Sequence, residues 1–273
     1  MKRNAAYISA TAAVLLLLPF GPLRADDQLA AQVEDTIRTT SERAESAFSL
    51  LPGWLIDLSA GYSMNRGNSD TQNLLARAAA IKQFEETWKL TGKGEYAWGK
   101  TKDQETREYE QTADRGQLSG QADLFLIENG FLYGRSEASY DRIKDLDRRL
   151  DSGLGIGYNV WRREENFAAL EAGVSYIDSK YENGATDHGL FLRMAQNGAL
   201  KINERVTLIE SVEYKPKFED FNDYLLTAEA ALRVSLSGAL YFQLTATSRY
   251  DNNAPEGVER NDLSMIASLG LSI

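Results

Sequence analysis

The sequence contains no cysteine and only one histidine among its 273 residues. The lack of cysteine excludes a disulfide framework, a thiolate metal site and lipoprotein acylation. Basic residues are in the minority, since 30 Lys and Arg stand against 40 Asp and Glu and leave a formal net charge of −10. Nucleic-acid phosphates attract a basic surface, so the acidic balance argues against nucleic acid as a partner.

Long apolar runs are also missing, apart from one near the N-terminus. Lys2 and Arg3 precede an apolar run that ends at Pro19, and small residues return at Ala25. This run is shorter than the roughly 20 residues that a membrane-spanning helix needs. We therefore predict that residues 1–25 are a signal peptide that exports the chain and is cleaved after Ala25.

What the remaining sequence does contain is strand periodicity. From Ile56 to Asn65, apolar or aromatic residues occupy the even positions, and polar or small residues occupy the odd positions. A period of two is typical of a β-strand whose faces meet different environments. Twelve segments show this pattern with varying strength: residues 54–65, 71–83, 87–99, 115–126, 132–141, 149–160, 167–176, 190–197, 206–215, 224–234, 240–250 and 263–273.

These segments predict an all-β protein, a transmembrane antiparallel up-and-down β-barrel of about 12 strands over residues 53–273. The connections support this interpretation, because short ones such as 85–86 and 237–238 alternate with longer, charged ones such as 100–114 and 178–189. Outer-membrane barrels have short periplasmic turns and longer external loops. We expect the protein to lie in the outer membrane of a Gram-negative-type bacterium, with the membrane lipid and the barrel-assembly machinery as its partners.

Two segments do not fit simple alternation. Residues 26–52 place apolar side chains three and four positions apart, which predicts a periplasmic amphipathic helix followed by a linker. In the segment 206–215, Glu210 falls on the otherwise apolar face, where a β-bulge would restore the alternation.

Catalytic and metal-binding patterns are weak. The single histidine, His188, lies beside Asp187 in a predicted external loop, and neither Ser136 nor Ser179 can be placed beside it as a nucleophile from sequence alone. Gly153, Gly155 and Gly157 resemble a nucleotide-binding loop but lack the following helix, so small inward residues of a strand explain them better. We therefore predict no catalytic residues, no metal site and no cofactor.

The inward positions of the predicted strands carry both charge signs. In a narrow lumen such groups would pair and close the barrel, whereas in a water-filled lumen they would line a pore for small solutes. The predicted lumen-lining residues are Arg77, Lys89, Lys93, Glu95, Arg115, Asp123, Arg135, Glu137, Arg149, Asp151, Glu171, Arg193, Glu229, Arg233 and Arg249.

Several short motifs resemble a known family. They are Gly61-Tyr62, Gly67-Asn68-Ser69-Asp70-Thr71, Tyr140-Asp141-Arg142, Leu146-Asp147-Arg148-Arg149 and Gly153-Leu154-Gly155-Ile156-Gly157-Tyr158. Over residues 54–273 the chain resembles the bacterial domain-of-unknown-function family labelled salt-induced outer-membrane protein. The resemblance implies an outer-membrane location and osmotic regulation, but no catalytic or binding residues. The chain ends in Ile273, whereas many outer-membrane barrels end in an aromatic residue that the assembly machinery recognises.

Three functions remain open at this point. The favoured hypothesis is a structural or envelope-stress protein without enzymatic activity and without an open channel. The alternative is a narrow channel for ions or small charged solutes, and a barrel-borne hydrolase is the least favoured. The sequence names no further protein partner.

Overall fold

The computed structural model describes residues 52–65, 70–103, 106–163, 166–254 and 259–273. The predicted signal peptide and nearly all of the predicted helix over residues 26–52 therefore lie outside the described residues. Within the described ranges, no helix is both long and apolar enough to cross a membrane.

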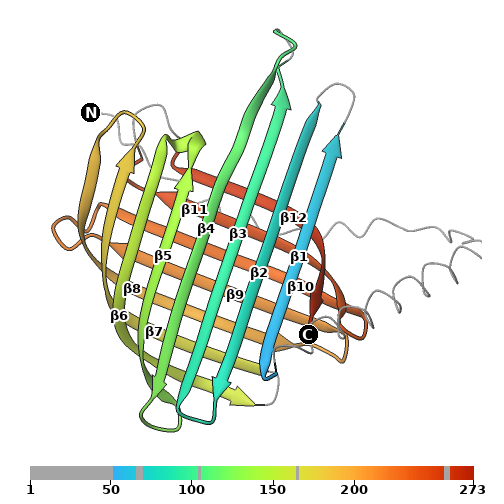
Figure 1. The fold of residues 1–273 in the computed structure, drawn as a ribbon, viewed down its shortest axis with the longest axis vertical. Coiled ribbons are helices and arrows are strands. Elements are labelled where there is room, and N and C mark those ends of the chain that lie inside the picture. Colours follow the sequence, from blue (N-terminus) through green and yellow to red (C-terminus); the bar gives the residue numbers. More distant parts are fainter. Residues whose placement is uncertain (1–51, 66–69, 104–105, 164–165, 255–258) are drawn as a thin grey trace, which may run out of the picture. The chain divides into compact units, whose positions relative to one another are not determined.

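Twelve antiparallel strands form one closed barrel, as the sequence predicts (Figure 1). Each strand pairs with its neighbours in sequence, and β1 closes the ring against β12. The strands are β1 (Trp54–Asn65), β2 (Thr71–Phe84), β3 (Trp88–Lys102), β4 (Tyr109–Phe125), β5 (Gly130–Asp141), β6 (Leu146–Arg163), β7 (Asn166–Tyr181), β8 (Thr186–Lys201), β9 (Val206–Pro216), β10 (Tyr224–Ser237), β11 (Leu240–Asp251) and β12 (Asn261–Ser272). A short 3₁₀ helix, η1 (Arg142–Lys144), joins β5 to β6.

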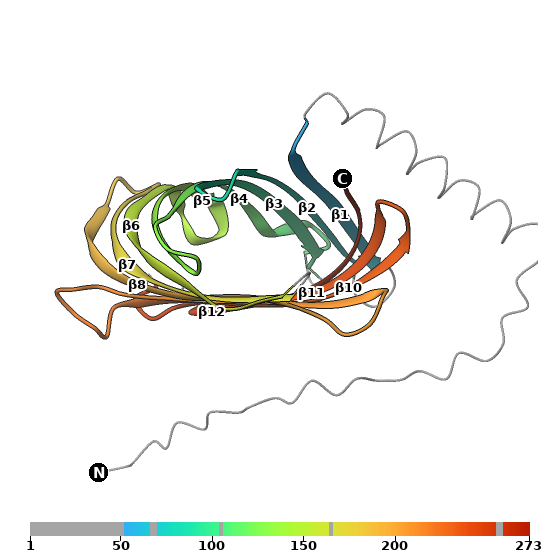
Figure 2. The same cartoon turned by 90° about the horizontal axis from the view of Figure 1, so that it is seen from below.

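The two ends of the barrel differ in their connections. Tight turns join β2 to β3, β4 to β5 and β10 to β11 at the end where β1 begins and β12 finishes, which we call the turn end. The opposite end, which we call the loop end, carries η1 and the β9–β10 connection. In Figure 2, the view from below shows β2 to β5 as an arched wall with β10 to β12 lying opposite.

Several strands extend farther towards the loop end than the alternation predicts. The segment 178–189, expected to be an external loop, is mostly strand, because β7 continues to Tyr181 and β8 begins at Thr186. Likewise, β4 begins at Tyr109 and β6 at Leu146. Beyond the apolar zone water can meet both faces, so the sequence loses its alternation while the backbone ladder continues.

The two faces of the strands have opposite chemistry. Large apolar side chains point outwards and remain exposed, including Leu118 at 68%, Leu154 at 66% and Leu263 at 76%. On β11 the outward Leu244 is 39% exposed, whereas the inward Thr245 is 3% exposed. An apolar exterior around a polar interior is the pattern of a barrel that faces lipid.

The strand with the poorest alternation contains no bulge. The register of β9 runs without a shift against both β8 and β10. Glu210 faces outwards and accepts a hydrogen bond from Nε2 of Gln196 on β8, at 2.8 Å. The suggested bulge is therefore wrong, because the register is continuous. The outward carboxylate of Glu210 is accommodated by the hydrogen bond from the Gln196 amide.

Inward glycines receive aromatic rings from the paired strand. Phe131 and Tyr133 on β5 are directly opposite Gly157 and Gly155 on β6. A Cβ atom on either glycine would clash with the ring or hydroxyl opposite it. The glycine pattern in β6 thus provides space for side chains that fill the lumen, as the interpretation of small inward residues requires.

Candidate functional site: the charged lumen

Inward side chains of β5 to β9 form a dense set of ion pairs. Arg193 donates to Glu171 at 2.7 Å and to Glu213 at 2.6 Å, and Lys215 lies 2.8 Å from both Asp151 and Glu213. The Asp151 side chain is 1% exposed and that of Arg193 is 6% exposed. Pairing of this kind offsets the cost of removing charges from water. We call this set the buried cluster: Arg135, Glu137, Asp151, Glu171, Arg193, Glu213 and Lys215.

Other ion pairs cross the lumen between strands that are not neighbours. Nη2 of Arg77 on β2 lies 2.7 Å from Oε2 of Glu229 on β10, and Nη2 of Arg249 on β11 lies 2.6 Å from Oε1 of Glu95 on β3. Three strands separate the partners of each pair along the ring. We call these cross-lumen ion pairs braces. A third brace, between Arg135 and Glu213 at 2.9 Å, joins β5 to β9 within the buried cluster. These braces narrow the bore of the barrel.

The inward face of β3 carries two cations that water reaches, Lys89 and Lys93. We call these two residues, with the neighbouring inward charges of β2 to β4, the open side: Arg77, Lys89, Lys93, Glu95 and Arg115. Lys89 is 34% exposed and pairs with the fully buried Asp123 at 2.7 Å. Lys93 shares the inward face with Glu95, two residues along β3, yet it is exposed and forms no ion pair with any described residue. An exposed inward lysine indicates that water enters this part of the lumen.

Arginine side chains surround the carboxylate at the centre of the open side. Glu95 has Arg249 at 2.6 Å and Arg77 at 2.8 Å, and Nε of Arg115 lies 3.8 Å away. That buried Nε atom has no hydrogen-bond partner among the described residues. Arg115 also lies directly opposite Asp141 on β5, so carboxylates stand on both sides of its strand.

A smaller group lies near the turn end. Nη1 of Arg233 lies 2.8 Å from Oδ2 of Asp57, and the Tyr241 hydroxyl donates to the same carboxylate. The Arg233 guanidinium also lies 3.9 Å from the centre of the Tyr241 ring. Tyr241 in turn lies over Gly270, where a Cβ would clash with the ring.

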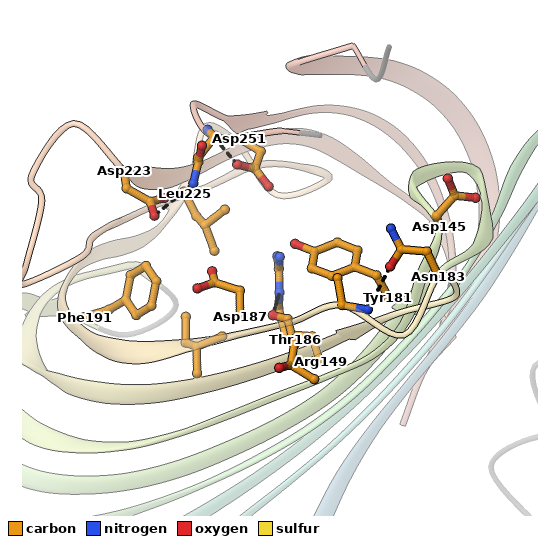
Figure 3. Close-up of a pocket in the computed structure, with 14 residues that line it drawn as sticks. Asp145, Arg149, Tyr181, Asn183, Thr186, Asp187, Phe191, Asp223, Leu225 and Asp251 are labelled. Carbon is orange, nitrogen blue, oxygen red and sulfur yellow. Dashed lines mark hydrogen bonds between the residues drawn. The ribbon is translucent and has the colours of Figure 1, made fainter. Parts of the chain in front are cut away.

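A pocket of about 310 Å³ opens at the loop end (Figure 3). Arg149, whose Nε donates to Ser179 at 2.9 Å, lines it together with several aspartates. Beside the pocket, Lys217 in the β9–β10 connection lies 2.7 Å from Asp187 and 3.7 Å from Asp223. The hydrogen bond to Asp187 raises the pKa of Lys217, so this lysine is charged at neutral pH. Because Arg149 lines this pocket and donates to Ser179, it is separate from the central ion pairs.

The structure gathers most of the residues selected from the sequence into the buried cluster, the open side and its braces. The sequence selection omitted Glu213 and Lys215, which join three other members of the buried cluster. Both lie on β9, where the outward Glu210 obscured the alternation. Counting inward positions from Val212 and Tyr214 would have found them.

The structure also separates the residues considered for hydrolysis. His188 lies on strand β8, not in a loop, and faces outwards, with its ring 6.4 Å from that of Tyr176. Ser179 is buried on the inward face of β7 and pairs in register with Asp187. Among the described residues, no three His, Asp or Glu side chains are grouped to hold a metal ion.

Comparison with family models places this barrel in a family. Residues 58–273 match the model described as "Protein of unknown function, DUF481". The chain belongs to this family. The DUF481 match begins within β1 and includes every charged residue of the buried cluster and the open side. No curated protein matches the DUF481 chain.

Several solved structures are similar to this chain at low sequence identity. The translocator domain of the autotransporter NalP from Neisseria meningitidis is 10% identical, with a TM-score of 0.46, and the match covers 90% of this chain and 97% of that chain. The NanC porin is also 10% identical, with a TM-score of 0.47 and coverage of 80% and 98%. An outer-membrane channel from Pseudomonas putida F1 is 9% identical, with a TM-score of 0.48 and coverage of 81% and 94%.

Proposed function

We propose that this DUF481 protein is an outer-membrane barrel whose narrow, water-filled lumen conducts ions and small charged solutes. The ring closes through a short ladder between β1 and β12, and its exterior is rich in exposed apolar side chains. Such a surface is stable in lipid, where every backbone group must have a partner within the protein. Export by a signal peptide over residues 1–25 is part of the same proposal.

The observation that carries the channel proposal is the environment of Lys93. This lysine points into the lumen but stays exposed, and the paired Lys89 is 34% exposed on the same strand. Lys93 has no ion-pair partner among the described residues, and an ammonium group without one is costly in a dry interior, so its position favours a water-filled lumen. The cross-lumen pairs Arg77–Glu229 and Arg249–Glu95 make this water-filled space narrow.

The cross-lumen pairs also support a second candidate, a structural or envelope-stress barrel that does not conduct. In that case the braces and the buried cluster would serve to stabilise the wall. The two candidates differ in one measurable property, because only the channel carries current.

Planar lipid bilayers containing the purified full-length mature protein test the proposal. We expect discrete current steps that are small for a barrel of this strand number, because the braces reduce the bore. Replacing both partners of one brace, in Arg77→Ala combined with Glu229→Ala, should enlarge the steps without leaving an unpaired charge. The absence of current in both proteins would contradict the channel and favour the structural candidate.

A matched control is available on the outer surface. Arg148 and Asp178 form an exposed ion pair at 3.4 Å between the neighbouring strands β6 and β7. The combination of Arg148→Ala with Asp178→Ala removes the same chemical groups outside the lumen. It should leave the conductance unchanged, and an equal increase in both double variants would refute the role assigned to the brace.

A further inference from the structure

The charges within the lumen are unequally distributed between its two sides. The buried cluster contains three cations and four carboxylates, and most of its side chains are nearly inaccessible. Around the rest of the lumen, outside the loop-end pocket, seven cations face six carboxylates, which leaves a formal charge of +1. The seven cations are Arg77, Lys89, Lys93, Arg115, Lys144, Arg233 and Arg249, and the six carboxylates are Asp57, Glu95, Asp123, Asp141, Glu229 and Asp262.

The central carboxylates on the water-accessible side are paired with cations, whereas Lys93 has no ion-pair partner among the described residues. Glu95 has three arginines within 4 Å, and Glu229 is held by Arg77 at 2.7 Å and by the Thr247 hydroxyl at 3.0 Å. Asp123 is fully buried. The exposed Lys93, with the partly exposed Lys89 on the same strand, therefore contributes most to the charge that a solute in the water meets.

We infer that the open side of the lumen selects small anions, although the chain as a whole is acidic. This inference rests on the proposed channel and names its substrate class. The positive charge lies beside the cross-lumen braces, where the passage is narrow and a permeating ion comes close to the wall. At 0.1 M ionic strength the screening length is about 10 Å, so fixed charges at this distance affect permeation.

The loop-end pocket makes the opposite contribution. Asp145, Asp187, Asp223 and Asp251 line it, together with Arg149 as the cationic side chain. If this acidic mouth determined selectivity, the channel would prefer cations. If the open side, which lies beside the braces, determines selectivity, the channel prefers anions.

The test is the reversal potential of the full-length mature protein in a planar bilayer under a tenfold KCl gradient. We expect its sign to show preference for chloride over potassium at low salt, and the preference to weaken in 1 M KCl, where the screening length is about 3 Å. Lys93→Glu should shift the reversal potential towards cations, and Lys93→Gln should shift it by a smaller amount in the same direction.

Lys180→Glu serves as the matched control, because Lys180 is 52% exposed and lies near Asp147 on the outer surface. It changes the same charge away from the lumen and should leave selectivity unaltered. Current with a preference for cations would overturn the anion inference while leaving the channel intact. Anion selectivity that Lys93→Glu does not change would overturn the role of the open side. The absence of any current would overturn the channel and the inference together.

Discussion

At the residue scale, the glycines of the barrel fall into two groups with different surroundings. A Cβ on Gly155 would meet the Tyr133 hydroxyl and the backbone of β7, whereas a Cβ on Gly120 has nothing within 4 Å. Both glycines lie in strand interiors. Gly155 provides space for the Tyr133 ring in the lumen, whereas no neighbouring side chain requires a glycine at Gly120.

Alanine substitutions distinguish the two groups. Gly155→Ala should lower the free energy of unfolding by about 1 to 3 kcal/mol, because the added methyl group displaces Tyr133 from a filled space. Gly120→Ala should be neutral or stabilise by up to about 1 kcal/mol, because glycine loses more conformational freedom on folding than alanine does. Denaturant unfolding from lipid vesicles measures both, and equal effects would contradict the packing account.

At the scale of the element, each strand separates a lipid-facing surface from the lumen. Leu244 on β11 faces outwards and is 39% exposed. Thr91 on β3 faces inwards on the accessible side of the lumen, between Lys89 and Lys93. Thr245, next to Leu244, is a poorer inward comparison because it is 3% exposed and accepts a hydrogen bond from Gln243.

We expect Leu244→Arg to destabilise the barrel by about 2 to 4 kcal/mol, because the guanidinium must lie in lipid or thin the bilayer around it. Thr91→Arg should cost much less, since water and carboxylates are within reach. Unfolding from vesicles in urea compares the two variants. A larger cost at Thr91 would mean that the lumen is dry on this side.

The seam between β1 and β12 is the shortest ladder of the barrel. Its register runs only from Asp57 to Ala60, with two further backbone bonds between Ile56 and Ile273, whereas β1 pairs with β2 from Trp54 to Asn65. Since the Ile56 amide donates to the carbonyl of Ile273, directly after β12, the even-numbered amides of β1 point to this seam. Beyond Ala60 these amides leave the paired region.

Hydrogen exchange should show this asymmetry. The amides of Tyr62 and Met64, on the seam side, should exchange faster than those of Gly61 and Ser63, which point to β2. Amide-resolved NMR of the barrel in lipid nanodiscs measures the rates, with Leu58 and Ala60 as protected references. Uniform protection along β1 would show that the seam is closed throughout.

At the scale of the whole molecule, the alternation of tight turns and longer connections gives the barrel a direction. We expect the loop end to face the cell exterior, since outer-membrane barrels place their short turns in the periplasm. An epitope inserted after Asn183, in the β7–β8 connection, should bind antibody on intact cells. The same epitope after Glu204, in the β8–β9 turn, should bind only after permeabilisation, and the reverse pattern would invert the topology.

The sequence by itself determined the strand count, the closed antiparallel barrel and the face on which most strand charges lie, with Glu213 and Lys215 on β9 as exceptions. These features follow from local rules, because a period of two fixes the face of a side chain and short turns fix which strands are neighbours. It could not determine the ends of the strands at the loop end, where water meets both faces and the alternation disappears.

Only the tertiary structure decided which charges meet. Arg77 and Glu229 are 152 residues apart and lie on strands separated by three others, so no local pattern relates them. The unequal division of the lumen has the same origin. Rings from β5 and paired charges from β5 to β9 fill one side, while β3 leaves Lys93 exposed on the other. The bore and the charge that a solute meets depend on contacts across the barrel, and these exist only once the ring has closed.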